Sequence, residues 1–191
     1  NTSNLVRAPA TPLADGGALL PLYFEVGNKY PASLRISSGG EMLRVVRISH
    51  NDESLQPTIL PLDALRAIAL LRDRGAAHVM RVVTTSDGCD TWDAIADTNV
   101  RNPGSAVVGL RLPDGTLAAV LNPLASGRNM LTLTASRNGR EWQRIATLAE
   151  GGANAEFSYP SAVLAGDELH ISYTSDRTSI APHVFRRETP Q

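Results

Sequence analysis

The chain repeats two short patterns with a period of about fifty residues, and this period limits its possible folds most strongly. The first pattern is a Gly-containing turn that closes on an apolar residue at Leu43, Trp92 and Trp142, which are 49 and 50 residues apart. The second is a leucine, a turn and an apolar run, found at residues 13–22, 62–71, 112–121 and 164–173. Two independent patterns that keep one spacing and one phase indicate a repeat protein.

The second pattern predicts a β-hairpin in each repeat. Asp-Gly between two apolar runs favours a tight turn, because glycine adopts positive φ at little cost. The segments that follow alternate in polarity or are continuously apolar, as buried strands are. Further strands are expected at residues 77–84 and 130–136. About four strands in each fifty-residue unit predict an all-β protein built from propeller blades.

One segment has an ambiguous pattern. Residues 61–74 begin with a proline and carry apolar side chains at helical spacing, so taken alone they favour a helix. They also lie in phase with the other three predicted hairpins. This position in the repeat favours a strand, and we predict a strand there.

The composition excludes several classes of protein. A hydrophobic share of 42% excludes a disordered or collagen-like chain. The net charge of −1 provides no broad basic field, so no nucleic-acid partner is expected. No apolar run approaches the roughly 18 residues of a membrane-spanning helix, so no membrane span is expected. The four histidines show no metal-ligand spacing, and we expect neither a metal nor a cofactor.

Cysteine content says little about the cellular compartment. Cys89 is the single cysteine of the chain, so no disulfide can form within it. Many secreted proteins also lack disulfides, which leaves the compartment open. A periplasmic or secreted location is favoured over a cytoplasmic one.

The turn at residues 85–92 contains side chains suited to holding a turn. The Asp87 carboxylate can accept backbone N–H bonds within the turn. Trp92 offers a large apolar face that can pack between sheets. Asn138 and Trp142 repeat the same two positions one period later. Because a repeated residue is more typical of architecture than of a unique active site, all four are predicted to be structural.

These turns resemble a motif of a known family. Residues 86–92 and 136–142 look like the Asp-boxes of sialidases, with Cys89 replacing the usual glycine in the first. Other stretches resemble sialidase segments in the same order: residues 55–57 with 71–72, residues 112–132, and residues 156–161. The chain is therefore similar to bacterial BNR-repeat, sialidase-like proteins.

The resemblance implies a six-bladed propeller of which this chain is the C-terminal portion. Residues 1–191 would supply about four four-stranded blades, at roughly 5–50, 51–100, 101–150 and 151–187. Repeat units need neighbours to bury their faces, and an open propeller exposes apolar surface and an unpaired edge. The missing blades are expected from an N-terminal half or from another chain.

The resemblance also implies a reaction, the retaining hydrolysis of a terminal sialic acid or a related acidic sugar. The sugar carboxylate needs cationic, planar partners, which arginine supplies. Arg72 and Arg128 match two of the three sialidase arginines. They correspond to the second and third of these arginines, and the first arginine and the catalytic Asp would precede residue 1. Tyr159 matches the position of the sialidase nucleophile. A neutral phenol suits that role because, unlike a carboxylate, it is not repelled by an anionic substrate.

Two further residues are candidate contacts to the sugar. Arg177 follows the last apolar strand and could reach an anionic group. Asn122 lies in the Asn-Pro step of the stretch that resembles a sialidase segment ahead of Arg128. Both are predicted to bind substrate.

The base that would take the Tyr159 proton departs from the family pattern. The sialidase glutamate falls on Gln56, sixteen residues before Arg72, and an amide cannot accept that proton. Glu156 is the alternative base, but residues 156 and 159 of a regular strand point to opposite faces. Glu156 would therefore need a turn or bulge before Tyr159, and Pro160 favours irregular backbone there.

Gln56 leaves other functions open. A glycan-binding or structural propeller without catalysis is one alternative. A hydrolase that acts on a different acidic or neutral sugar is another. In each case the expected partner is a carbohydrate.

Overall fold

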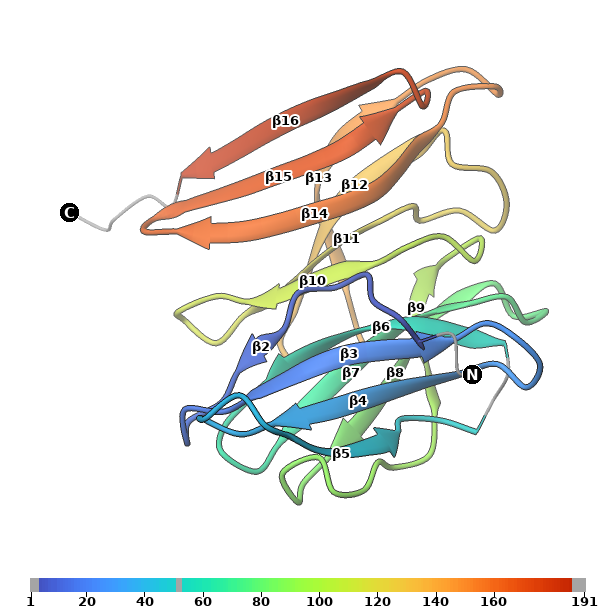
Figure 1. The fold of residues 1–191 in the computed structure, drawn as a ribbon. Helices are drawn as coiled ribbons and strands as arrows, with labels where there is room; N and C mark the ends of the chain where they lie inside the picture. Colours follow the sequence, from blue (N-terminus) through green and yellow to red (C-terminus); the bar gives the residue numbers. More distant parts are fainter. Residues whose placement is uncertain (1–3, 51–52, 187–191) are drawn as a thin grey trace.

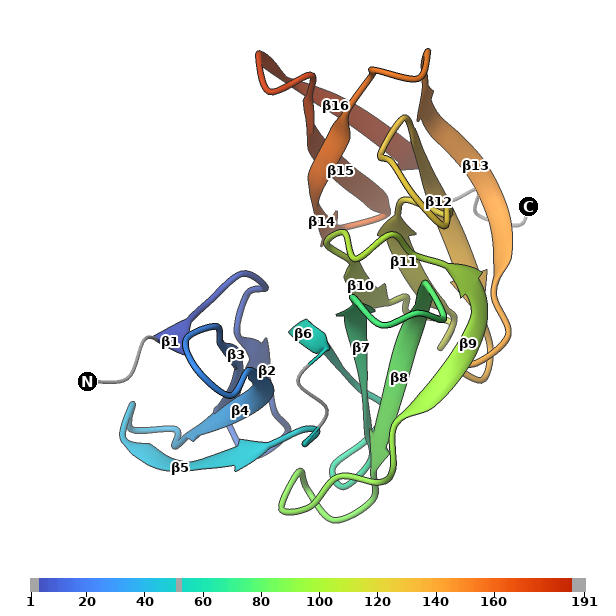
Figure 2. The same ribbon diagram turned by 90° about the vertical axis from the view of Figure 1, so that its right-hand side faces the viewer.

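The computed structural model describes residues 4–50 and 53–186, and the regular structure in them is β-strand. The strands form four antiparallel sheets in chain order, which we call blades one to four. Figure 2 shows the blades following one another around an arc. The all-β propeller expected from the repeat is thus confirmed. The described part of the chain contains no helix that could cross a membrane.

Consecutive strands of each blade are hydrogen-bonded neighbours (Figure 1), apart from a first strand of blade one that is split into β1 (Asn4–Leu5) and β2 (Thr11–Pro12) (Figure 2). Blade one also contains β3 (Ala18–Phe24), β4 (Tyr30–Ile36) and β5 (Met42–Arg47). Blade two contains β6 (Ser54–Pro61), β7 (Ala67–Asp73), β8 (Val79–Thr85) and β9 (Ala96–Arg101). Blade three contains β10 (Val108–Arg111), β11 (Leu117–Leu121), β12 (Met130–Ser136) and β13 (Gln143–Glu150). Blade four contains β14 (Phe157–Ala165), β15 (Glu168–Ser175) and β16 (Ser179–Arg186).

The inner strands of neighbouring blades lie side by side. β10 contacts both β6 and β14, and β6 also packs against β3. In blade one, β1 and β2 are short pieces that both pair with β3. Blade four has three strands within the described residues. The residues at 51 and 187, where two predicted units begin or end, lie outside the described residues.

The segment with an ambiguous pattern forms strand β7, as its place in the repeat predicts. Its backbone pairs with β6 on one side and β8 on the other. Residues 67–71 are all buried, on both faces of the sheet. A surface helix would bury one face only, so this run of apolar side chains suits a central strand.

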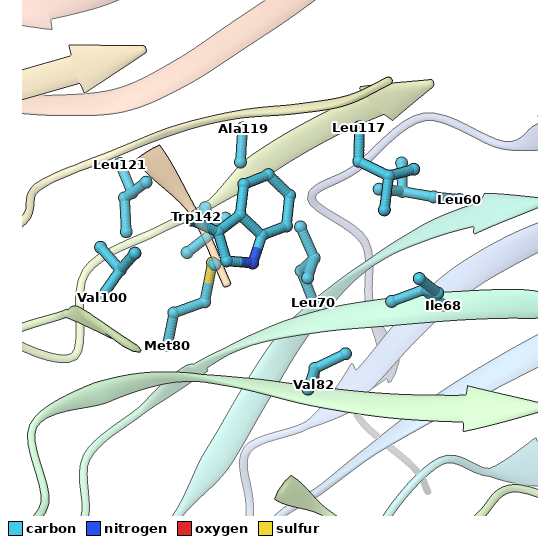
Figure 3. Close-up of a cluster of buried hydrophobic side chains, with 11 residues drawn as sticks. Leu60, Ile68, Leu70, Met80, Val82, Val100, Leu117, Ala119, Leu121 and Trp142 are labelled. Atoms are coloured by element: carbon cyan, nitrogen blue, oxygen red, sulfur yellow. The ribbon is translucent and has the colours of Figure 1, made fainter. Parts of the chain in front are cut away.

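In the described part of the chain, three of the four clusters of buried hydrophobic residues lie between neighbouring blades. Trp142 is 4% exposed and packs between blades two and three (Figure 3). Its indole N–H donates to the carbonyl of Gly139 at 2.9 Å, so the ring is buried without an unsatisfied donor. The buried residues around it come from both blades: Leu60, Ile68, Leu70, Met80, Val82, Val100, Val107, Leu117, Ala119 and Leu121.

The two Asp-boxes tighten the turns after β8 and β12. The Asp87 carboxylate accepts the N–H groups of Asp90 and Thr91, each at 3.0 Å. Asn138 does the same one blade later, accepting the N–H groups of Arg140 and Glu141. The tryptophan that closes each box packs against the interface with the preceding blade. Each box therefore closes its turn with the Asp or Asn side chain and packs its tryptophan at the interface with the preceding blade.

Blade one has an apolar face that points away from blade two. Leu19 contributes to the core with blade two, while Leu22 lies on the opposite face because strand side chains alternate. That face carries a cluster made of blade-one residues alone: Leu20, Leu22, Phe24, Tyr30, Ala32, Leu34 and Ile36. On the same blade Met42 is 78% exposed.

Replacing Trp142 with alanine is expected to lower the free energy of unfolding by about 3–5 kcal/mol, because it opens a cavity between blades two and three. Chemical denaturation of the full-length protein measures the loss. Glu141→Ala changes the exposed neighbour and is expected to cost less than about 0.5 kcal/mol. Equal losses in the two variants would contradict the placement of Trp142 in the core.

Candidate functional site

The candidate residues lie together at one end of the blades because some of their strands begin at that end and the others finish there. β6 and β14 begin at this end, and Gln56 and Tyr159 lie near those beginnings. β7 runs back to the same end and carries Arg72 near its last residue. Arg128 immediately precedes β12, which starts there. The Asp-boxes and the turns between the first two strands of blades two, three and four lie at the opposite end, where Gly88 N–H donates to the Leu65 carbonyl of the β6–β7 turn.

Gln56 and Tyr159 occupy equivalent bulges on blades two and four. Each has a φ of 52° and precedes a proline, and each lies at a register shift between the first and second strands of its blade. Positive φ is uncommon for side chains of this size, and such strain clusters at functional sites. A bulge also re-aims a side chain, so the irregular backbone required between Glu156 and Tyr159 is present.

The two bulges present their side chains differently. Tyr159 is 55% exposed, whereas Gln56 is 6% exposed. The Gln56 Nε2 donates to the hydroxyl of Tyr23, from β3, at 3.2 Å. The Gln56 Oε1 has no hydrogen-bond partner among the described residues. The amide thus pairs with a buried tyrosine of blade one.

Arg72 lies between blades one and two with part of its hydrogen-bonding capacity unused. Its Nη2 pairs with Glu25 Oε1 at 3.2 Å, and its buried Nε has no partner within the described part of the chain. Burial lowers the pKa of Arg72, and the charge of Glu25 opposes that shift. Guanidinium groups remain charged at neutral pH, so Arg72 offers a cation with a free donor.

Glu156 is held between two arginines. Its Oε1 pairs with Arg128 Nη1 at 3.1 Å, and its Oε2 pairs with Arg177 Nε at 2.8 Å. The hydroxyl of Ser158 also donates to Oε1, at 3.0 Å. The guanidinium carbon of Arg128 lies 5.9 Å from the centre of the Tyr159 ring. This cluster places Glu156, Arg128, Arg177 and Tyr159 in one neighbourhood.

The surroundings of Glu156 favour its ionised form. Partial burial raises its pKa, but hydrogen bonds from Arg177 and Ser158 and the charges of Arg177 and Arg128 outweigh that effect. The pKa of Glu156 therefore lies below its ordinary value. A carboxylate with a lowered pKa is a weaker proton acceptor, so this geometry holds Glu156 primarily as a partner of Arg128 and Arg177.

Asn122 is a buried side chain that binds backbone carbonyls next to the candidate residues. It is fully buried, and its Nδ2 donates to the carbonyls of Met130 at 2.7 Å, Phe157 at 2.8 Å and Arg128 at 3.4 Å. These bonds tie the segment before β12 to the start of β14. Asn122 thereby positions the Arg128 backbone, and its amide nitrogen does not face solvent.

Arg7 is a member of the site that sequence reasoning missed. Its Nη2 donates to the carbonyl of Pro160 at 2.7 Å, and its Nη1 donates to that of Val107 at 3.0 Å. Burial and the charge of Arg72 lower the pKa of Arg7 to about 10 against smaller opposing effects of Tyr23 and Tyr159. Arg7 lies between the short strands β1 and β2, so no repeated pattern marks it.

Arg72 and Arg128 line one open pocket of about 380 Å³. Arg74, His78, Pro103 and Gly104 complete its lining. Three guanidinium groups in one hollow favour an anion, and carboxylates suit the fork of arginine. No group of three or more His, Cys, Asp or Glu that could hold a metal is found in residues 4–50 and 53–186.

Comparison with known proteins agrees with the fold. A family model described as a BNR repeat-like domain matches residues 1–171. The solved structure of the Hadza microbial sialidase Hz136 superposes with a TM-score of 0.72 at 17% identity, covering 93% of this chain and 36% of that one. The leech intramolecular trans-sialidase, solved with 2,7-anhydro-Neu5Ac, gives a TM-score of 0.71 at 14% identity, covering 96% and 32%.

A third similar structure is the intramolecular trans-sialidase of Ruminococcus gnavus, solved with oseltamivir carboxylate. Its TM-score is 0.70 at 15% identity, covering 93% of this chain and 42% of that one. The chain thus spans between 32% and 42% of the length of these relatives. No curated protein sequence matches it significantly. The likeness to sialidases, at these identities, establishes the fold.

Glu156→Gln is expected to destabilise the protein at pH 7 and to lose this effect in acid. The native pKa of Glu156 is lowered, so its stabilisation is fully present above the unfolded value of about 4.3. That stabilisation is lost as the pH falls through the native pKa. Unfolding midpoints of the wild type and the variant should therefore differ more at pH 7 than at pH 3.

The matched control for this pH series is Glu150→Gln, which changes an exposed carboxylate at the end of β13. Its unfolding midpoint should stay close to that of the wild type at both pH values. A Glu156→Gln difference that persists unchanged at pH 3 would contradict the stabilisation of the ionised carboxylate by Arg128 and Arg177.

Proposed function

The chain belongs to the BNR repeat-like domain family of sialidase-like proteins, and we propose on that premise that it forms part of a glycoside hydrolase of the exo-α-sialidase type. The substrate is a glycoconjugate that ends in sialic acid or a related acidic sugar. The products are the free acidic sugar and the shortened glycoconjugate. The reaction retains the anomeric configuration, because the sugar is first bonded covalently to the protein and then released by water.

One observation carries the proposal: Arg72 and Arg128, from different blades, line the same pocket beside Tyr159. An acidic sugar whose carboxylate lies between the two guanidinium groups gains charge-assisted, fork-like hydrogen bonds. The exposed Tyr159 phenol, next to Arg128, is then available to the anomeric carbon. The bulge before Pro160 supports this orientation of the ring.

The proposed reaction proceeds in two displacements. The Tyr159 oxygen forms a bond to the anomeric carbon while the bond to the leaving oxygen breaks, and water later releases the sugar from the tyrosine. The phenol loses its proton in the first displacement. An acid that protonates the leaving oxygen is proposed to come from outside residues 1–191. Met42 and Val45 of β5 are 78% and 52% exposed, and these exposed apolar side chains on blade one support missing blades beside it.

Glu156 is the proposed acceptor of the Tyr159 proton once substrate is bound. In the free site Arg128 and Arg177 hold the carboxylate. A sugar carboxylate competes for Arg128 and weakens the Arg128–Glu156 pair. The pKa of Glu156 then rises toward its ordinary value, which makes Glu156 a better base when it is needed. Gln56 contributes binding only, since an amide has no basic site.

A second candidate function is glycan binding without hydrolysis. Gln56 in place of an acid and the pairing of Glu156 with two arginines favour this alternative. Binding of the acidic sugar at Arg72 and Arg128 is common to both functions. Turnover therefore separates them, and affinity alone does not.

Tyr159→Phe in the complete protein is expected to lower hydrolysis of a fluorogenic sialoside at least about a thousandfold, because the nucleophilic oxygen is removed. Binding of free sialic acid should remain within about threefold, since the arginines are intact. Steady-state kinetics and calorimetric titration measure the two quantities. Tyr30→Phe is the matched control, because its ring stacks on Phe24 in blade one.

Hydrolysis that survives Tyr159→Phe would exclude Tyr159 as the nucleophile. A complete wild-type protein that binds the sugar and never cleaves it would favour the glycan-binding alternative. Loss of both activities in Tyr30→Phe would point to a damaged fold rather than to the site.

A further inference from the structure

Arg74 is a cation of the arginine pocket for which the described residues provide no ion pair. The other two arginines of the pocket are paired, Arg72 with Glu25 and Arg128 with Glu156. Arg74 is exposed, and no ion pair to it exists within residues 4–50 and 53–186. The charge of Arg74 is close enough to disfavour the charged form of Arg72. The pocket thus carries positive charge that the described residues leave uncompensated.

Arg74 also borders a second hollow, of about 350 Å³, next to the first. Gly27, Lys29 and Glu53 complete the lining of this hollow. Lys29 has no ion pair in the described part of the chain, while Glu53 is already engaged in an interaction of its own. The Glu53 carboxylate lies over Gly75, where an added Cβ would come within 2.4 Å of its Oε2. Two hollows therefore adjoin at Arg74, and each contains cationic side chains.

The loop beside Arg74 fixes the stem of its side chain. A Cβ on Gly104, whose φ is 71°, would come within 3.2 Å of Arg74 Cγ and 3.3 Å of the Asp73 carbonyl oxygen. The same loop is tied down by the buried Asn102, whose N–H donates to the His78 carbonyl at 2.8 Å. Asn102 Oδ1 in turn accepts the N–H of Ser105 at 3.0 Å. The stem of the Arg74 side chain therefore lies against Gly104, and Arg74 lines both hollows.

We propose that the site takes a glycan with two neighbouring acidic sugars, one carboxylate between Arg72 and Arg128 and the second at Arg74 and Lys29. This inference rests on the proposed function, because it uses the same first subsite. The terminal sugar occupies the pocket of Arg72 and Arg128. The adjoining sugar lies across Arg74 into the hollow of Lys29, where its carboxylate finds unpaired cations.

Selectivity for the second acidic sugar should be modest and sensitive to salt. Arg74 is exposed, so its attraction for a carboxylate is worth less than that of a buried pair. An advantage of about five- to tenfold in affinity is expected for a disaccharide of two sialic acids over a single sialic acid glycoside. Raising the salt concentration to about 1 M should remove most of the advantage, because exposed charges are screened.

The test measures binding of α-linked disialic acid and of methyl sialoside to the full-length Tyr159→Phe protein, which cannot consume either ligand. Arg74→Gln is expected to lower affinity for disialic acid about five- to tenfold and affinity for methyl sialoside by less, because Arg74 lines both hollows. Lys29→Gln changes the second hollow alone, so it should lower affinity for disialic acid by a smaller factor and leave methyl sialoside within about twofold. Arg111→Gln, an exposed arginine at the opposite end of blade three, should change neither affinity.

The outcomes separate this inference from the proposed function. Tight binding of methyl sialoside with no advantage for disialic acid would overturn the inference and leave the proposed function standing. Equal losses for both ligands in Arg74→Gln would also overturn it. Binding of neither ligand by the complete protein would overturn both.

Discussion

Burial of apolar surface between neighbouring blades is the interaction on which the rest of the structure depends. No blade has a core of its own that buries both faces, and Trp142 is buried only because blade two covers blade three. This packing fixes the order and direction of the inner strands. It thereby brings Gln56, Arg72, Arg128 and Tyr159, which are distant in sequence, to one end of the molecule.

In the candidate site, burial removes water from several arginines, and ion pairs with acidic side chains offset only part of their charge. Arg7 and Arg72 lose hydration by burial, yet each keeps a buried Nε without a partner among the described residues. Glu156 offsets the charges of Arg128 and Arg177, while Arg74 has no ion pair within residues 4–50 and 53–186. The positive charge in excess is what an acidic ligand would neutralise.

Local patterns predicted much of the fold. The repeat period predicted the blades, and its phase correctly assigned β7 against the helical spacing of its residues. Pro160 indicated the irregular backbone at Tyr159. Other features depend on contacts that no local pattern encodes. Arg7 reaches Pro160 across 153 residues of sequence, and Gln56 pairs with Tyr23 across the interface of two blades.

The most direct test is a crystal structure of the complete protein with a bound acidic sugar. We expect the sugar carboxylate within hydrogen-bond distance, about 2.7–3.2 Å, of both Arg72 and Arg128. We expect the Tyr159 oxygen about 3–3.5 Å from the anomeric carbon. A sugar bound elsewhere, or one whose carboxylate contacts neither arginine, would contradict an acidic-sugar site at this end of the propeller.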